Sequence, residues 1–214
     1  MPEQLHIILN SLYAFHAKHH RVPRLLNQED AAELQSIAKE YLSGKMEIEG
    51  EDFKVEKVDE QLVQNVAFFA ETQISPVSSF WGGIITQEVV KMTGKYTPLR
   101  QWLHHEFFEV LPEGQVSRTL SNDRYQDYHI IFGDEFVRRA SESSSFVIGA
   151  GALGCEFIKM FALMGLSTRK GKLSVTDDDN IEISNLNRQF LFRKQHVGKN
   201  KSETACSVGK SINP

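Results

Sequence analysis

A glycine-rich segment in the last third of the chain constrains the fold more than any other feature. The apolar residues 146–148 predict a buried strand, and the pattern Gly149-x-Gly151-x-x-Gly154 follows it at once. Glycines at this spacing permit a tight turn, let the backbone approach a phosphate, and let the next helix pack close to the sheet. Apolar periodicity predicts that helix over residues 152–164, with its N-terminal N–H groups facing any anion above the loop.

A second strand is predicted over residues 172–176, so the segment is a βαβ unit of a Rossmann-like α/β fold, and this strand ends in Asp177. An acidic side chain at this point typically accepts hydrogen bonds from ribose hydroxyls. Asp179 faces the same way if the strand continues, and we expect it to support the same site. The acidic run 177–179 also offers ligands to a hard cation, but ribose contact is favoured.

Polar and cationic residues follow within one loop and one helix start: Asn185, Arg188, Gln189 and Lys201. A planar arginine fork and a lysine point charge suit a triphosphate, whose charge must be neutralised while its α-phosphorus is attacked. An NAD-dependent oxidoreductase is the alternative. It would explain the glycine loop and Asp177 but would leave these later residues without a role.

The string Asp-x-Asp-x-Ile-Glu-x-Ser-Asn-Leu-Asn-Arg-Gln-Phe-Leu-Phe-Arg, residues 177–193, resembles the adenylation core of ubiquitin-activating enzymes. The strings Gly-x-Gly-x-x-Gly-Cys-Glu before it and Gly-Lys-x-Lys-Ser-Glu after it, residues 198–203, resemble the same family. The resemblance implies a Rossmann-like adenylation fold of the ThiF/MoeB type, preceded by a mainly helical segment. It also implies that Mg-ATP is used to adenylate the C-terminal carboxylate of ubiquitin, before a cysteine elsewhere takes the acyl group as a thioester.

The same resemblance implies a role for each residue of the site. The three loop glycines lie beneath ATP, Asp177 binds the ribose, and Asp179 supports it. The phosphates are engaged by Asn185, Arg188, Gln189 and Lys201. Arg188 and Lys201 are the expected catalytic residues, because they stabilise charge in the transition state.

Other parts of the family's machinery are expected outside these residues. The magnesium-binding aspartate, the catalytic cysteine and the ubiquitin-fold domain are expected beyond Pro214, so no metal ligand is predicted in this chain. At residues 125–128, Asp127 stands where the family's first half carries an arginine, and Tyr128 replaces a glutamine. The 214 residues alone are therefore expected to bind nucleotide weakly and not to adenylate ubiquitin.

The chain before the glycine loop is predicted to be helical up to about residue 95. Asn27 and Asp59 are predicted N-caps of the second and third helices, and a fourth helix is predicted from Pro76 to Met92. Residues 44–58 are predicted to be a charged connection, and residues 96–110 to be paired strands with a turn. A polar linker is predicted over residues 112–121, and a short lead-in to the first strand over residues 124–138.

The resemblance also divides the chain into domains. Residues 1–58 correspond to a helical insertion or flanking region, 59–120 to the end of an inactive adenylation half, and 121–214 to the truncated start of the active half. Subunits of the heterodimeric SUMO- and NEDD8-activating enzymes share the 146–201 signature but would have no first half fused before it. The single-chain ubiquitin type is therefore favoured.

Composition limits the classes of partner that the chain is expected to bind. The formal charge of −4 gives no electrostatic case for nucleic acid or an anionic membrane, and no apolar run is long enough to span a bilayer. Two cysteines, Cys155 and Cys206, imply a reducing compartment, with Cys155 packed in the core. The resemblance implies ubiquitin and ubiquitin-conjugating enzymes as partners, and location in cytoplasm and nucleus. A non-catalytic interaction protein with an adenylation fold remains a second alternative.

Overall fold

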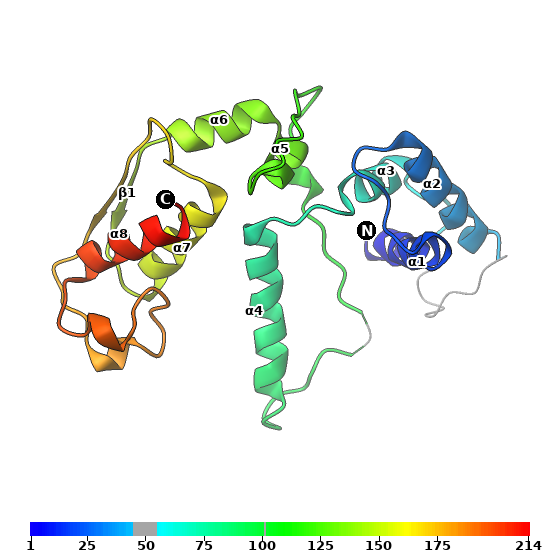
Figure 1. Ribbon diagram of the computed structural model, residues 1–214. Helices are drawn as coiled ribbons and strands as arrows, with labels where there is room; N and C mark the ends of the chain where they lie inside the picture. The colour runs from blue at the N-terminus through cyan, green and yellow to red at the C-terminus, as the bar shows by residue number, and fades with distance from the viewer. Residues whose placement is uncertain (45–54, 101) are drawn as a thin grey trace. The chain divides into compact units, whose positions relative to one another are not determined.

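A computed structural model describes residues 1–44, 55–100 and 102–214 (Figure 1). These residues form two compact units, the first comprising Met1–Gln73 and Trp81–Glu113, and the second Ile74–Phe80 and Gly114–Pro214. Most of the predicted charged connection, residues 44–58, lies outside the described residues. Among the described residues, every helix is too short or too polar to cross a membrane.

Three helices build the core of the first unit: α1 (Pro2–His19), α2 (Gln28–Leu42) and α3 (Glu60–Phe69). Both predicted N-caps are confirmed. Asn27 accepts a hydrogen bond from the Asp30 N–H at 2.9 Å, and the Asp59 carboxylate accepts from the first turn of α3. The helix α2 packs against both α1 and α3 around fully buried aliphatic and aromatic side chains, among them Ile8, Phe15, Leu34, Ala38 and Val63.

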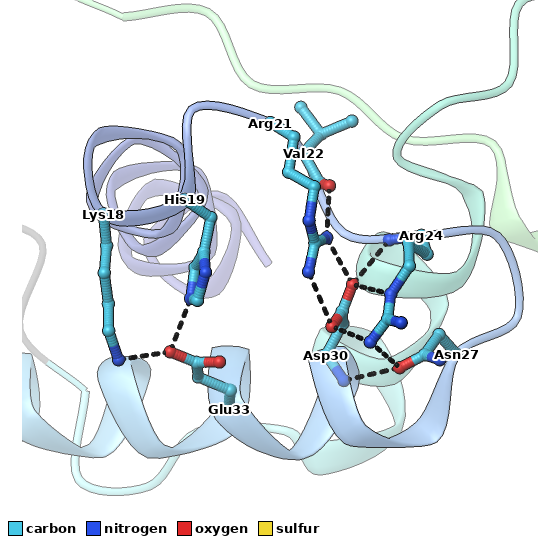
Figure 2. Close-up of polar contacts among 8 residues, drawn as sticks. All are labelled: Lys18, His19, Arg21, Val22, Arg24, Asn27, Asp30 and Glu33. Carbon is cyan, nitrogen blue, oxygen red and sulfur yellow. Dashed lines mark hydrogen bonds and ion pairs between the residues drawn. The ribbon is translucent and has the colours of Figure 1, made fainter.

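A buried carboxylate holds the connection between α1 and α2 (Figure 2). The Asp30 side chain is 4% exposed and accepts hydrogen bonds from Arg21 at 2.5 and 3.1 Å and from the Arg24 guanidinium at 3.1 and 2.8 Å. The Arg24 backbone N–H donates to it as well, at 2.8 Å. These contacts, with Arg24 contributing most and Arg21 next, hold the pKa of Asp30 far below its usual range, so the carboxylate stays charged.

The predicted paired strands over residues 96–110 are wrong. The described residues of this segment form no strand, and Phe108–Val110 form the short 3-10 helix η1. Both Trp102 and His104 contact His6 of α1: the Trp102 ring, itself half exposed, lies 5.2 Å from the His6 ring, and His104 Nε2 lies 3.1 Å from His6 Nδ1. The apolar side chains of this segment therefore lie partly on a helix and partly in solvent, and its described residues have no hydrogen-bonded neighbouring strand.

The fourth predicted helix is confirmed as α4 (Ser75–Lys91), whose residues are divided between the two units. The structure describes every residue of α4, and none of them is buried. At its end, Glu88 pairs with Lys91 at 2.5 Å and accepts the Leu99 N–H at 2.8 Å.

The second unit contains the predicted βαβ arrangement. Strand β1 (Ser145–Ile148) pairs in parallel with β2 (Leu173–Thr176), and α7 (Ala152–Met164) connects them. The helix α8 (Lys201–Ile212) packs against α7 and β2, and the short 3-10 helices η2 (Ile183–Asn185) and η3 (Lys194–His196) lie between β2 and α8 along the chain (Figure 1). The predicted α/β class is confirmed.

Two details of this unit differ from prediction. The lead-in over residues 124–138 contains the helix α5 (Gln126–Phe132) and the start of α6 (Asp134–Glu142), which continues beyond residue 138. The strand β1 is not buried on both sides, because Phe146 and Ile148 are 64% and 80% exposed while Val147 packs on the core. That core is formed mainly by Cys155 and Ile158 of α7 and by the segment that carries Leu191 and Phe192, so the predicted core position of Cys155 is confirmed.

Candidate functional site

The glycine loop lies between β1 and α7, and its three glycines have different surroundings. Gly149 has φ +94° and donates its N–H to the Thr176 carbonyl at 2.7 Å, so it turns the chain at the end of the strand. A Cβ at Gly149 or Gly151 would meet nothing within 4 Å, whereas a Cβ at Gly154 would lie 2.0 Å from the Gly149 carbonyl oxygen. Gly154 therefore permits the close helix packing, and Gly149 and Gly151 leave the loop backbone open to an incoming group.

Asp177 joins this loop to the end of β2. Its Oδ2 accepts the Ala150 N–H at 2.6 Å, and its Oδ1 accepts the Asp179 N–H at 3.0 Å. The structure thus places the predicted ribose ligand beside the glycine loop, as parallel strands that end at one edge of a sheet require. Carboxylate oxygens of Asp177, Asp178 and Asp179 all lie within 4.8 Å of one another.

Lys201 and Asp179 form an ion pair at the N-terminus of α8. The Lys201 Nζ lies 2.6 Å from Asp179 Oδ2, and the lysine side chain is 9% exposed against 67% for the aspartate. This hydrogen bond raises the pKa of Lys201 above its usual value, so the ammonium is charged at neutral pH. Asp179 consequently faces Lys201, and the ribose support that its spacing predicted stays a prediction.

Asn185, the last residue of η2, and Gln189, in the segment after it, are both buried. The Asn185 Oδ1 accepts the Glu182 N–H at 2.9 Å, and the Asn185 carbonyl accepts the Gln189 N–H at 2.9 Å. The Gln189 side chain is 4% exposed, and its Oε1 accepts no hydrogen bond from the described residues. A buried amide oxygen of this kind gains free energy from any ligand or water that donates to it.

Arg188 is exposed and is held by its own segment. Its Nη1 donates to the Ser184 carbonyl at 2.8 Å and to Asn187 Oδ1 at 3.2 Å. Hydrogen bonds therefore connect Asp177 with the glycine loop and Asp179 with Lys201. Among the described residues, by contrast, the Arg188 side chain bonds only to those of its own segment.

One residue was missed by the sequence reasoning. Asn200 caps α8, with its Oδ1 accepting the Glu203 N–H at 3.1 Å, and its Nδ2 donates to the Asp177 carbonyl at 3.3 Å. It thereby connects the start of α8 to the end of β2. The signal was present, since an asparagine three residues before a glutamate marks a helix start.

The chemistry of these residues fits a nucleoside triphosphate. The open backbone of the loop faces the N-terminus of α7, a cationic side chain stands at the start of α8, and Gln189 offers an oxygen with no hydrogen-bond donor among the described residues. A βαβ unit with this loop, an acidic strand end and a cationic helix start defines a class of α/β nucleotide-binding protein.

Comparison with known families places the chain within that class. Residues 125–214 match the ThiF family, and residues 1–42 match the ubiquitin-activating enzyme E1 four-helix bundle. The chain is 41% identical to ubiquitin-like modifier-activating enzyme 1 of Oryctolagus cuniculus and 42% identical to ubiquitin-activating enzyme E1 1 of Arabidopsis thaliana. Each alignment covers 100% of this chain and 20% of the relative.

The chain therefore belongs to the ubiquitin-activating enzyme family, and it spans about a fifth of the length of these relatives. Its fold is the ThiF/MoeB adenylation type predicted from the sequence. Among solved structures, the tRNA N6-threonylcarbamoyladenosine dehydratase TcdA of E. coli aligns at 24% identity with a TM-score of 0.39, covering 42% of this chain and 36% of that one. MccB of E. coli aligns at 27% identity with the same TM-score, covering 44% and 28%.

Proposed function

We propose that this chain contributes the ATP site of an enzyme that activates ubiquitin by adenylating its C-terminal carboxylate. The observation that carries the proposal is the charged, largely buried ammonium of Lys201. The short segment after β2 links it to the open glycine loop, because Asp179 pairs with Lys201 and Asp177 accepts the Ala150 N–H of the loop. A triphosphate needs such a cation, whereas a nicotinamide dinucleotide has no evident use for it. Family membership supports the same assignment.

The proposed roles are consistent with the geometry of the site. Gly149 and Gly151 present backbone to the nucleotide, with Gly154 fixing the approach of α7. Asp177 accepts ribose hydroxyls in this proposal, and its contacts with the Ala150 and Asp179 N–H groups fix its carboxylate beside the loop. Asn185 orders the segment that carries Gln189, whose free Oε1 faces no donor among the described residues.

Arg188 and Lys201 supply the positive charge for the reaction. Mg-ATP provides an activated α-phosphorus that the ubiquitin carboxylate attacks, with pyrophosphate as the leaving group. Lys201 is charged in advance and donates to phosphate oxygens from the start of α8. Arg188, exposed on its own turn, adds a planar fork of donors after rotation about its side-chain bonds.

Other parts of the proposal come from the family resemblance. We propose that residues 59–120 close an inactive adenylation half, that residues 121–214 open the active half, and that residues 1–58 flank them. Ubiquitin-conjugating enzymes would receive the thioester from a cysteine outside these residues, and a magnesium-binding aspartate would also lie outside them. Activity in cytoplasm and nucleus belongs to the same proposal.

Ubiquitin-dependent exchange of pyrophosphate into ATP tests the adenylation step. The chain is extended to the full length of its relatives, and Lys201→Ala is compared with Lys199→Ala, which removes an exposed lysine two residues away. Loss of one preorganised charge donor lowers the exchange rate by about 10²–10³-fold in Lys201→Ala, and Lys199→Ala retains the parent rate.

Two outcomes would contradict the proposal. No exchange with ubiquitin, SUMO or NEDD8 in the extended chain would favour a non-catalytic interaction protein. A change in nicotinamide fluorescence on mixing with NADH, without any effect of ATP, would favour an oxidoreductase. The 214 residues alone are proposed to show no exchange.

A further inference from the structure

The ion pair between Asp179 and Lys201 is unequal in its exposure. The lysine side chain is almost fully buried, while the aspartate side chain is two-thirds exposed. The carboxylate is therefore the solvent-facing member of the pair, and the ammonium lies behind it. A charged ammonium in this position loses most of its hydration and needs a close anion to compensate.

The backbone around the pair is held in place on both sides. The Lys201 N–H donates to the Asp179 carbonyl at 3.0 Å, so the two residues are joined through main chain as well as side chain. Next to them, Ile181 donates to the Lys199 carbonyl at 2.9 Å, and Asn180 and Asn200 form an isolated antiparallel bridge. The backbones of the segment after β2 and of the start of α8 are thus held together, which keeps the two side chains within reach of each other.

We propose, on the basis of the function proposed above, that Asp179 is a positioning residue that holds the Lys201 ammonium in place until a nucleotide phosphate replaces it. Lys201 then exchanges a carboxylate oxygen for a phosphate oxygen and needs no change of rotamer. The exposed carboxylate returns to water at little cost, since it is already two-thirds hydrated. Asp179 thus acts on ATP through Lys201 and not through the ribose.

Competitive labelling of lysines in the nucleotide-free protein tests this pairing without relying on activity. The amine reactivity of each lysine towards acetic anhydride is read by mass spectrometry in the parent, Asp179→Asn and Asp178→Asn proteins. Asp179→Asn keeps the size of the side chain and removes its charge, and Asp178→Asn removes the adjacent exposed charge. The exposed Lys199 serves as the internal reference.

The expected result is selective. In Asp179→Asn, the reactivity of Lys201 rises about tenfold or more relative to Lys199, because loss of the hydrogen-bonded carboxylate lowers the pKa of the lysine. Asp178→Asn leaves the ratio unchanged. An unchanged ratio in Asp179→Asn, with the protein folded by circular dichroism, would overturn the proposal.

Kinetics separate this proposal from the proposed function. In the extended chain, Asp179→Asn is expected to raise the KM for ATP in pyrophosphate exchange about tenfold while kcat changes less, because the carboxylate pairs with Lys201 only in the nucleotide-free protein. Asp179→Glu is expected to restore most of the affinity. If the parent exchanges pyrophosphate and Asp179→Asn matches it, the positioning role fails and the adenylation site stands. If the parent shows no exchange but the labelling result holds, the pair is structural and the proposed function fails.

Discussion

The two glycines Gly154 and Gly151 differ in what surrounds them, and alanine at each position should have a different consequence. A Cβ at Gly154 would lie 2.0 Å from the backbone oxygen and 2.9 Å from the carbonyl carbon of Gly149, and contacts under 3.0 Å force a shift. The obstacle is backbone at the end of β1, so it cannot rotate away as a side chain would. We expect Gly154→Ala to destabilise the βαβ unit by about 2–3 kcal/mol, within the usual range for overpacking.

Amide hydrogen exchange measured by mass spectrometry reports this loss locally. Exchange of the α7 amides through local opening should accelerate about 30-fold to 150-fold in Gly154→Ala, because each 1.36 kcal/mol corresponds to a factor of ten. The amides of α1 and α2 belong to the other compact unit and serve as internal controls with unchanged rates. Equal α7 protection in Gly154→Ala and the parent would refute the close approach of helix and loop.

Gly151→Ala is the matched variant in the same loop. Its φ of −72° suits alanine and nothing lies within 4 Å of the new Cβ, so the cost should not exceed about 1 kcal/mol, the usual loss at a helix N-cap. Its Cβ would instead occupy the space proposed for the nucleotide. Calorimetric titration of the extended chain should therefore show weaker ATP binding with nearly normal α7 protection. Unaltered ATP affinity would place the nucleotide elsewhere.

Three further predictions concern other parts of the chain. Asp30→Asn removes the charge that two arginines share, and thermal unfolding should show a loss of about 1.5–3 kcal/mol, the contribution of a hydrogen bond to a charged group. Gly165→Ala should destabilise more than Gly94→Ala in urea, because both have positive φ but only Gly165 has an aromatic side chain 2.4 Å from the new Cβ. Burial, and then the nearby His6, lower the pKa of His104, so folding stability should be complete above about pH 6.5 and fall as the pH drops below it; urea midpoints across pH should show a shallower dependence in His104→Asn.

The predictable elements were those whose signals are local. Apolar periodicity and bounding glycines placed α7 at residues 152–164, and the side chains of Asn27 and Asp59 marked two helix starts. The helices α5 and α6 were missed because they are short and no side chain caps their N-termini. The false strands over residues 96–110 show the opposite error, since a short stretch rich in aromatic and aliphatic residues does not by itself show that a neighbouring strand pairs with it.

The site, like the fold, was predictable only in part. The chemistry of its residues could be predicted from the sequence, because glycine, carboxylate, amide and cation follow one another at short spacing. Their partners could not, since the contact between Asp179 and Lys201 joins residues that are 22 positions apart. Spacing along an assumed strand predicted that Asp179 faces the same way as Asp177, but β2 ends at Thr176 and the Asp179 side chain contacts Lys201 of α8.

The two cations proposed to act on the phosphates are held by different means. Lys201 is fixed by a carboxylate and by backbone pairing between the segment after β2 and the start of α8, whereas Arg188 is held only by neighbours within its own turn. Lys201 is consequently preorganised and loses little conformational entropy on binding a phosphate, while Arg188 must leave the Ser184 carbonyl and Asn187 to reach it. Removing Arg188 should therefore affect mainly the step in which charge develops, and changes to the segment between η2 and η3 should alter the contribution of Arg188 without disturbing Lys201.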